Sequence, residues 1–231
     1  MRTEAQPLAG AVIAFDLDGT LVDSAPDLVA TLNHILAEEG IAPLPFDQGR
    51  SLIGHGARRL LQRGFEAQGL EVAPEALEVL WLRFIDHYNL HSADLTRPFP
   101  GVPESLEALR AAGARLAVCT NKLTRLSTPI LEALDLARHF DAVIGADLAP
   151  APKPDPRHLE MAVQAAGGDL RRAVMVGDAG TDAGAARAAG TPLVLVSFGY
   201  TEVPAWELRP DRLIDHFDEL LPACLELLVP A

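Results

Sequence analysis

Two carboxylates one residue apart, Asp16 and Asp18, end an apolar run near the start of the chain. The run from Val12 to Phe15 is apolar and mostly β-prone, so it predicts a buried strand. Ligands of open α/β sheets bind beyond the carboxyl ends of the strands, which is where both acids fall. Two close carboxylates repel each other unless a cation, a shared proton or donors intervene. The pair therefore predicts a charged site at this strand end.

Two later segments also place polar side chains directly after apolar runs. Thr120, Asn121 and Lys122 follow one such run, and a hydroxyl and an amide at a strand tip suit phosphoryl oxygens. The same residue types also form ordinary turns, and a lysine after a turn is often only solvated. Asp178 follows another apolar run, and Asp182 falls in the first turn of an expected helix. A carboxylate there can also serve simply to favour the helix N-terminus.

A lysine between two prolines is the remaining candidate. Lys153 stands between Pro152 and Pro154, which stiffen the backbone and keep this residue out of a helix. The segment is compatible with a solvated loop and with a lysine that points inward at a charge. Only the second interpretation makes use of the stiffness.

These candidates need a scaffold, and the hydrophobic pattern predicts one. Apolar runs alternate with amphipathic helical patterns, which is typical of a mostly parallel sheet covered on both faces. The expected strands are 11–17, 115–120, 142–145, 173–177 and 192–197, with a weaker one at 212–215. The expected helices between the later strands are 103–112, 123–134, 156–166 and 181–189. The predicted fold class is α/β, with a doubly wound, Rossmann-like parallel sheet as its core.

The stretch from Thr20 to Pro98 has no strand-like run and is expected to be helical throughout. Ser24 and Asp27 resemble a capping pair at the start of its first helix. Three amphipathic stripes follow, and helices with one apolar face must pack on each other. The stripes are Leu28, Leu32, Ile35 and Leu36; Ala57, Leu60, Leu61 and Phe65; and Leu77, Leu80, Trp81, Phe84, Ile85 and Tyr88. We expect a catalytic core of residues 1–21 and 98–231, and an inserted all-helical cap domain, 22–97, that acts as a lid.

Charge and composition limit the partners. The 231 residues carry a formal charge of −13, which argues against nucleic acid because phosphate backbones require a basic surface. We expect no membrane span and no signal peptide, and hence a cytoplasmic protein, either a monomer or a homodimer. Cys119 and Cys224 provide no disulfide framework. An anionic substrate would meet a repulsive overall field, so a phosphate site must be locally positive.

In their order, these segments resemble the four motifs of the haloacid dehalogenase superfamily of phosphohydrolases. The motifs as they stand here are DLDGT at 16–20, TNK at 120–122, PKPDP at 152–156 and VGDAGTD at 176–182. Ala179 stands where family members often have serine, a departure that removes a hydroxyl but no ligand. Each motif can occur by chance, but the ordered set spans nearly the whole chain. The resemblance implies the superfamily's fold and its phosphoryl-transfer chemistry.

The resemblance also implies the catalytic roles. Asp16 would be the nucleophile that forms an aspartyl-phosphate, and Asp18 would be the general acid and base. Thr120 and Lys153 would complete the catalytic set by holding phosphoryl oxygens. The other core residues expected to contact the substrate are Leu17, Gly19, Thr20, Asn121 and Lys122.

A Mg²⁺ cofactor is the second implication of the resemblance. Asp16, Asp178 and the backbone carbonyl of Asp18 would bind the ion, and Asp182 would support them. Magnesium prefers oxygen ligands in an octahedral arrangement, which this acidic set can provide.

A glycine-rich loop in the expected cap is the candidate for selecting the substrate. Residues 52–59, LIGHGARR, place glycines before a helix, where backbone N–H groups can meet an anion. Glycine before a helix and solvated arginines are also ordinary surface features. Together with FDLDGTLVDSAPDL and TNK, the loop resembles the phosphoglycolate phosphatase-like family. This implies a small phosphorylated metabolite, 2-phosphoglycolate, as substrate. The expected cap contacts are Gly54, His55, Gly56 and Arg59.

Other interpretations share part of the pattern. Phosphatases for sugar phosphates, N-acetylmuramic acid 6-phosphate or pyrophosphate share much of it, and a β-phosphoglucomutase-like mutase has the same core and cap class. A haloacid dehalogenase lacks the second aspartate, so Asp18 and Lys153 count against it. A phosphonoacetaldehyde hydrolase needs a lysine in the cap, and residues 21–97 contain none. A non-enzymatic binding protein is disfavoured because no catalytic aspartate is missing.

Overall fold

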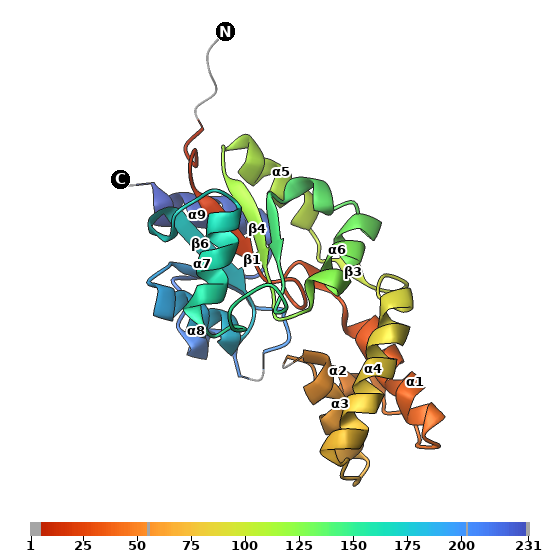
Figure 1. Cartoon of the computed structure of the whole chain (residues 1–231). Helices are drawn as coiled ribbons and strands as arrows, with labels where there is room; N and C mark the ends of the chain where they lie inside the picture. The colour runs from red at the N-terminus through yellow and green to blue at the C-terminus, as the bar shows by residue number, and fades with distance from the viewer. Residues whose placement is uncertain (1–5, 55, 202, 230–231) are drawn as a thin grey trace. The chain divides into compact units, whose positions relative to one another are not determined.

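The computed structural model describes residues 6–54, 56–201 and 203–229 of the chain (Figure 1). The chain divides into two compact units. One unit combines the residues up to Val22 with those from Pro98 onward, and it contains the large sheet. The other unit, Asp23–Arg97, is helical. The helical unit is therefore an insertion after the first strand of the sheet unit.

The large sheet consists of six parallel strands in the order β5-β4-β1-β6-β7-β8. Along the chain, β1, β4 and β5 extend the sheet in one direction, and β6, β7 and β8 extend it in the other. This is the order of a doubly wound nucleotide-binding sheet, and it confirms the expected fold class. The strands are β1 (Val12–Phe15), β4 (Arg115–Cys119), β5 (Ala142–Ile144), β6 (Ala173–Gly177), β7 (Leu193–Val196) and β8 (Arg212–Ile214).

Side chains of β1 alternate between the two layers of the core. Ile13 and Phe15 belong to the apolar cluster shared with α5, α6 and α9, whereas Val12 and Ala14 belong to the one shared with α7 and α8. All four β1 residues are fully buried, as expected for a central strand covered on both faces. The helices are α5 (Val102–Ala111), α6 (Thr124–Ala133), α7 (Pro156–Ala165), α8 (Gly180–Ala189) and α9 (Leu220–Leu228). Short 3₁₀ turns are η1 (Ala137–His139), η2 (Leu170–Arg172), η3 (Ala205–Leu208) and η4 (Phe217–Glu219).

The helical unit contains α1 (Ala25–Glu38), α2 (Phe46–Arg50), α3 (Gly56–Ala67) and α4 (Pro74–His91). Helices α1 and α3 both pack against α4. The expectation that this stretch is helical throughout is wrong at its ends, where β2 (Val22–Asp23) and β3 (Arg97–Pro98) pair. Two-residue strands and the five-residue α2 are too short to give a periodic signal in sequence. In the described part of the chain, no helix is both long and apolar enough to cross a membrane.

Asp27 does not act as a capping partner of Ser24. The Ser24 side chain makes no capping hydrogen bond to α1. Instead, the buried Asp27 carboxylate accepts hydrogen bonds from the Leu95 N–H (3.0 and 3.1 Å), the Thr96 N–H (2.8 Å) and the Thr96 hydroxyl (2.7 Å). The carboxylate thus ties the start of α1 to the segment that follows α4. The sequence pattern around Asp27 could not predict this contact, because Leu95 lies 68 residues further along the chain.

Asp27→Asn should lower the free energy of unfolding by about 2 kcal/mol, since hydrogen bonds to a charged acceptor contribute more than neutral ones. The amide also turns an N–H₂ group toward donors that need an acceptor. Urea unfolding followed by circular dichroism measures the change. The matched control is Asp86→Asn on the exposed side of α4, which should change stability by less than about 0.5 kcal/mol. Equal losses for both variants would contradict the role of Asp27.

Candidate active site

Asp16 and Asp18 lie just beyond β1, at the edge where the parallel strands end. The Asp16 N–H donates to the Val176 carbonyl of β6 (2.9 Å), which holds Asp16 beside the neighbouring strand. The strand order of the sheet reverses between β1 and β6. Doubly wound sheets bind ligands at this switch point. The first carboxylate of the sequence motif is therefore located where the fold favours a ligand.

The turn after β1 uses its own backbone groups to hold its shape. The Leu17 N–H donates to Asp16 Oδ1 (2.7 Å), the Gly19 N–H to the Val22 carbonyl (3.0 Å) and the Thr20 N–H to the Leu17 carbonyl (3.4 Å). Leu17, Gly19 and Thr20 were expected to contact substrate. In the structure, their N–H groups shape the turn that presents the two aspartates, and their contact with substrate stays a prediction.

Lys153 is fully buried, and its ammonium lies between two carboxylates. The distances from Nζ are 3.1 Å to Asp16 Oδ1 and 2.6 Å to Asp182 Oδ1. Burial alone lowers the pKa of Lys153, but the adjoining carboxylates outweigh it and hold the pKa above its ordinary value. The lysine is therefore charged at neutral pH and joins two segments of the site.

Asn121, in the loop after β4, holds the backbone of Lys153. Its Nδ2 donates to the Lys153 carbonyl (2.9 Å), and its Oδ1 accepts from the Lys153 N–H (2.8 Å). The sequence pattern assigned Asn121 to the substrate. In the structure, both ends of its amide hold the backbone of Lys153, and a contact with substrate stays a prediction.

Asp178 and Asp182 are fixed by donors on three segments. Asp178 accepts from the Thr20 hydroxyl through Oδ1 (3.1 Å) and from the Tyr200 N–H through Oδ2 (2.7 Å). Asp182 Oδ2 accepts from the N–H groups of Asp178 (3.1 Å) and Ala179 (3.0 Å) at the start of α8. Asp182 thus completes the first turn of the helix with one oxygen and contacts the lysine ammonium with the other.

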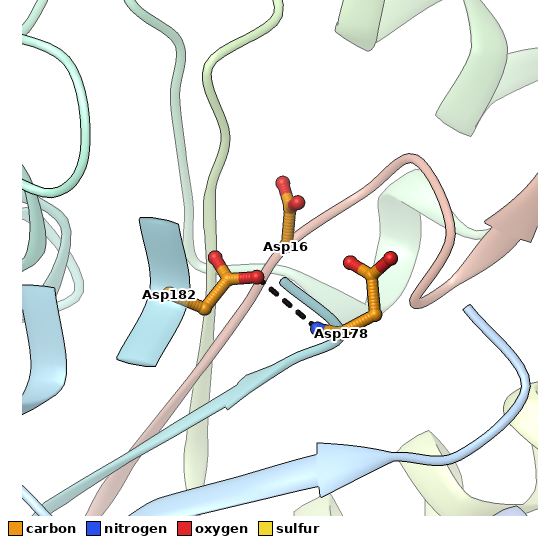
Figure 2. A group of neighbouring side chains, drawn as sticks. All are labelled: Asp16, Asp178 and Asp182. Atoms are coloured by element: carbon orange, nitrogen blue, oxygen red, sulfur yellow. Dashed lines mark hydrogen bonds between the residues drawn. The ribbon is translucent and has the colours of Figure 1, made fainter. Parts of the chain in front are cut away.

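Asp16, Asp178 and Asp182 form a group in which one oxygen of each lies within 4.8 Å of the others. Figure 2 shows their carboxylates at the ends of β1 and β6 and in the first turn of α8. Burial first, and then neighbouring acids, raises the pKa of Asp16 to about 6 and that of Asp178 well above its ordinary value. A nearby cation stabilises the charged form of buried carboxyls whose pKa is raised in this way. Three oxygen donors fit a divalent ion, and within the described ranges no other group of three or more His, Cys, Asp and Glu residues is close enough to share one.

Thr120 and Lys122 reach the site from the end of β4. The buried Thr120 hydroxyl accepts from the Lys122 N–H (3.2 Å), and a hydrogen bond from Thr120 lowers the pKa of Asp16. The Lys122 ammonium lies 3.0 and 3.1 Å from the two oxygens of Asp18. Four segments that are far apart in sequence therefore meet at one edge of the sheet.

The loop after β7 belongs to the site, although no sequence pattern pointed to it. Tyr200 donates to Asp178, and a Cβ on Gly199 would overlap the same aspartate. Gly19 has a φ of +85°, and a Cβ there would lie 2.5 Å from Asp178 Oδ2 and 2.9 Å from the Tyr200 ring. The pair Gly199-Tyr200 could not be selected from the sequence, because a glycine next to an aromatic residue after a strand is common in ordinary turns.

The remaining expected contacts lie in the helical unit. Gly54 and Gly56 have φ angles of 127° and 79°, which explains why glycine occupies both positions. Arg59 is exposed, with its Nη1 2.8 Å from Gln62 Oε1. His55 lies outside the described residues. A substrate-binding role for these four residues stays a prediction.

A central sheet with this switch point and this acidic site is the arrangement of haloacid dehalogenase-like hydrolases. The chain matches the sequence model of the haloacid dehalogenase-like hydrolase family over residues 13–196, which include all four motifs. The protein belongs to this family, as its motifs implied.

The chain is also similar over most of its length to individual proteins of the family. A phosphoglycolate phosphatase from Caulobacter vibrioides is 58% identical over 221 residues, covering 96% of this chain and 93% of that protein. One from Agrobacterium fabrum is 47% identical over 224 residues, covering 97% and 96%. A crystal structure described as a predicted phosphoglycolate phosphatase from Haemophilus somnus has a TM-score of 0.86 at 32% identity, covering 93% and 97%.

Gly19→Ala should lower hydrolase activity about 100-fold, because the new methyl group would displace Asp178. Gly190→Ala is the matched control, since its φ is +67° and a Cβ there meets nothing within 4 Å. Both variants should lose about 1 kcal/mol of stability from backbone strain. Gly19→Ala should lose more because its methyl group overlaps Asp178, and it alone should lose activity. Kinetic assays and urea unfolding measure the two effects separately. Full activity in Gly19→Ala would show that the close approach to Asp178 is unimportant.

His158 on α7 should make stability depend on pH. Its buried Nε2 donates to the Ile144 carbonyl (3.1 Å), and burial lowers its pKa from 6.5. The unfolded chain therefore gains a proton before the folded one does, and this histidine's contribution is lost as pH falls below 6.5. Asp16 and Asp178, with raised pKa values, act in the opposite direction.

A difference measurement isolates the histidine. The loss of stability between about pH 7.5 and about pH 5.5 should be smaller in His158→Gln than in the wild type, because glutamine keeps a donor without titrating. Urea unfolding at the two pH values measures it. Identical pH dependence in both proteins would rule out a titrating role for His158.

Proposed function

We propose that this protein is a magnesium-dependent phosphomonoester hydrolase whose substrate is 2-phosphoglycolate. The observation that carries the proposal is the convergence of Asp16, Asp18, Lys153 and Asp178 at the switch point of the sheet. Phosphate monoesters resist hydrolysis because their charge repels nucleophiles, and catalysis consists mainly of positioning and charge compensation. Carboxylates held beside a buried ammonium offer both the positioning and the charge compensation that this reaction requires.

Asp16 is the proposed nucleophile. Its carboxylate oxygen bonds to phosphorus while the ester P–O bond breaks, which leaves an aspartyl-phosphate and releases the alcohol. Asp18 donates a proton to the departing oxygen and then accepts one from the water that attacks the phosphorus, so that phosphate leaves and both acids are restored. Thr120 and Lys153 hold phosphoryl oxygens, and the Lys153 ammonium is already 3.1 Å from Asp16.

The proposed metal ligands are Asp16, Asp178 and the backbone carbonyl of Asp18. Asp182 already accepts hydrogen bonds from the Lys153 ammonium and from two backbone N–H groups, which suits a supporting role. When bound, Mg²⁺ would neutralise phosphoryl and carboxylate oxygens. A divalent cation matches the buried acidic group, and hard oxygen donors favour magnesium in particular.

The choice of substrate rests on similarity and on the chain's own motifs. Relatives named phosphoglycolate phosphatase share 58% and 47% identity with nearly the whole chain. The TNK tripeptide and the GHGA loop support the same assignment. Cap contacts with the substrate, a monomeric or dimeric state and a cytoplasmic location remain expectations of the sequence.

A panel of phosphate esters tests the proposal. With Mg²⁺, kcat/KM for 2-phosphoglycolate should exceed that for sugar phosphates, N-acetylmuramic acid 6-phosphate and pyrophosphate by about tenfold or more. Removing the cation with a chelator should abolish turnover, and adding Mg²⁺ should restore it. Asp16→Asn should be inactive because it lacks the nucleophile.

Two outcomes would change the assignment. A sugar phosphate that outperforms 2-phosphoglycolate about tenfold would replace the substrate but leave the phosphatase chemistry. Conversion of a sugar 1-phosphate to its 6-phosphate in the presence of a bisphosphate activator would indicate a mutase. Normal turnover in Asp16→Asn would exclude the proposed nucleophile.

A further inference from the structure

Lysine is rare in this chain, and both copies lie in the candidate active site. Of nineteen lysine and arginine residues, two are lysines, Lys122 and Lys153. Each has its ammonium against site carboxylates. An ammonium is a compact charge that fits between closely spaced oxygens, whereas a guanidinium is broad and planar. Lys153 has a role in the phosphoryl-transfer steps, but those steps make no use of Lys122.

The Lys122 ammonium holds Asp18 by both carboxylate oxygens, at 3.0 and 3.1 Å. The two side chains are only 7% and 21% exposed. Lys122 follows β4 and Asp18 follows β1, and these paired parallel strands bring the two loops together. A nearly buried positive charge therefore lies beside the residue assigned to the leaving oxygen.

The proposed substrate brings a second carboxylate to this position. In 2-phosphoglycolate, a single methylene carbon separates the ester oxygen from the carboxylate. A residue that protonates the ester oxygen thus works next to that carboxylate. Two carboxylates side by side repel unless a cation compensates them, and Lys122 is a cation already in place.

We propose that Lys122 recognises the substrate carboxylate by exchanging part of its ion pair with Asp18 for one with the substrate. The three N–H donors of an ammonium allow it to contact both carboxylates during the exchange. Selectivity for an ester that carries a carboxylate is then set in the sheet unit by Lys122, in addition to any contribution from the cap. The inference rests on the proposed function, which supplies the carboxylate.

Matched substrates separate recognition from catalysis. 2-Hydroxyethyl phosphate resembles 2-phosphoglycolate, with a hydroxymethyl group in place of the carboxylate. In Lys122→Met, the ratio of kcat/KM for 2-phosphoglycolate to that for 2-hydroxyethyl phosphate should fall about 30-fold, because only the first substrate loses a charge-assisted contact. Any disturbance of Asp18 lowers both rates and cancels in the ratio. Lys122→Arg keeps the charge and should retain most of the selectivity.

The two lysines also permit a direct binding measurement. Protein labelled with ¹³C at lysine Cε gives two lysine signals, and Lys122→Arg assigns them. In the Asp16→Asn background with Mg²⁺, 2-phosphoglycolate should shift both signals. 2-Hydroxyethyl phosphate should shift the Lys153 signal alone. It carries the phosphoryl group that Lys153 contacts but lacks the carboxylate that Lys122 would contact. This measurement leaves Lys122 in place, so it does not depend on the folding of Lys122→Met.

An unchanged selectivity ratio, or a Lys122 signal that responds equally to both ligands, overturns the inference. The wild type tests the proposed function separately. A wild type that prefers esters without a carboxylate refutes the substrate assignment before any variant is made. A wild type that prefers 2-phosphoglycolate, with an unchanged ratio in Lys122→Met, refutes only the role of Lys122.

Discussion

The ion pairs of the Lys153 ammonium with Asp16 and Asp182 are the contacts on which the site depends. Both contacts lie in a region with little solvent, so removing the lysine would leave its two carboxylate partners uncompensated at a cost of several kcal/mol. The surrounding structure fixes the lysine accordingly. Asn121 holds its backbone at both the N–H and the carbonyl. The next residue, Pro154, packs closely against Gly184 of α8. A Cβ added at Gly184 would lie 2.5 Å from the Cβ of Pro154.

This arrangement reconciles a strongly acidic chain with an anionic ligand. A net charge of −13 repels a phosphate ester at long range, but that repulsion between exposed charges is screened within about 10 Å at moderate salt. Close to the sheet edge, the two ammonium groups and a divalent cation would determine the local potential. Burial raises the pKa values of the Asp16 and Asp178 carboxyls, and the same burial would favour binding of a cation between them. The acidic residues of the site thus favour a bound cation, and that cation would make the site locally positive.

The sequence predicted the fold and the meeting point of the motifs because both follow from strand periodicity. Strand ends lie within two residues of expectation, and residues after parallel strands must emerge at one edge. The contacts of individual side chains did not follow. Asp27 pairs with Leu95 and Thr96, and Lys122 with Asp18, across separations that no local pattern encodes. The contact of Tyr200 with Asp178 uses a backbone N–H, which every residue except proline possesses, so residue type gives no signal.

The scarcity of lysine has a practical consequence for proteolysis. An endoproteinase that cuts after lysine has two candidate bonds in this chain, and Pro154 blocks the one after Lys153. The remaining bond, Lys122–Leu123, follows a side chain that is almost entirely enclosed. Cleavage there requires the loop after β4 to open, so its rate reports the local opening free energy of the catalytic edge. The rate of cutting at this one bond would thus give a residue-level probe of how a bound ion or ester rigidifies the loop after β4.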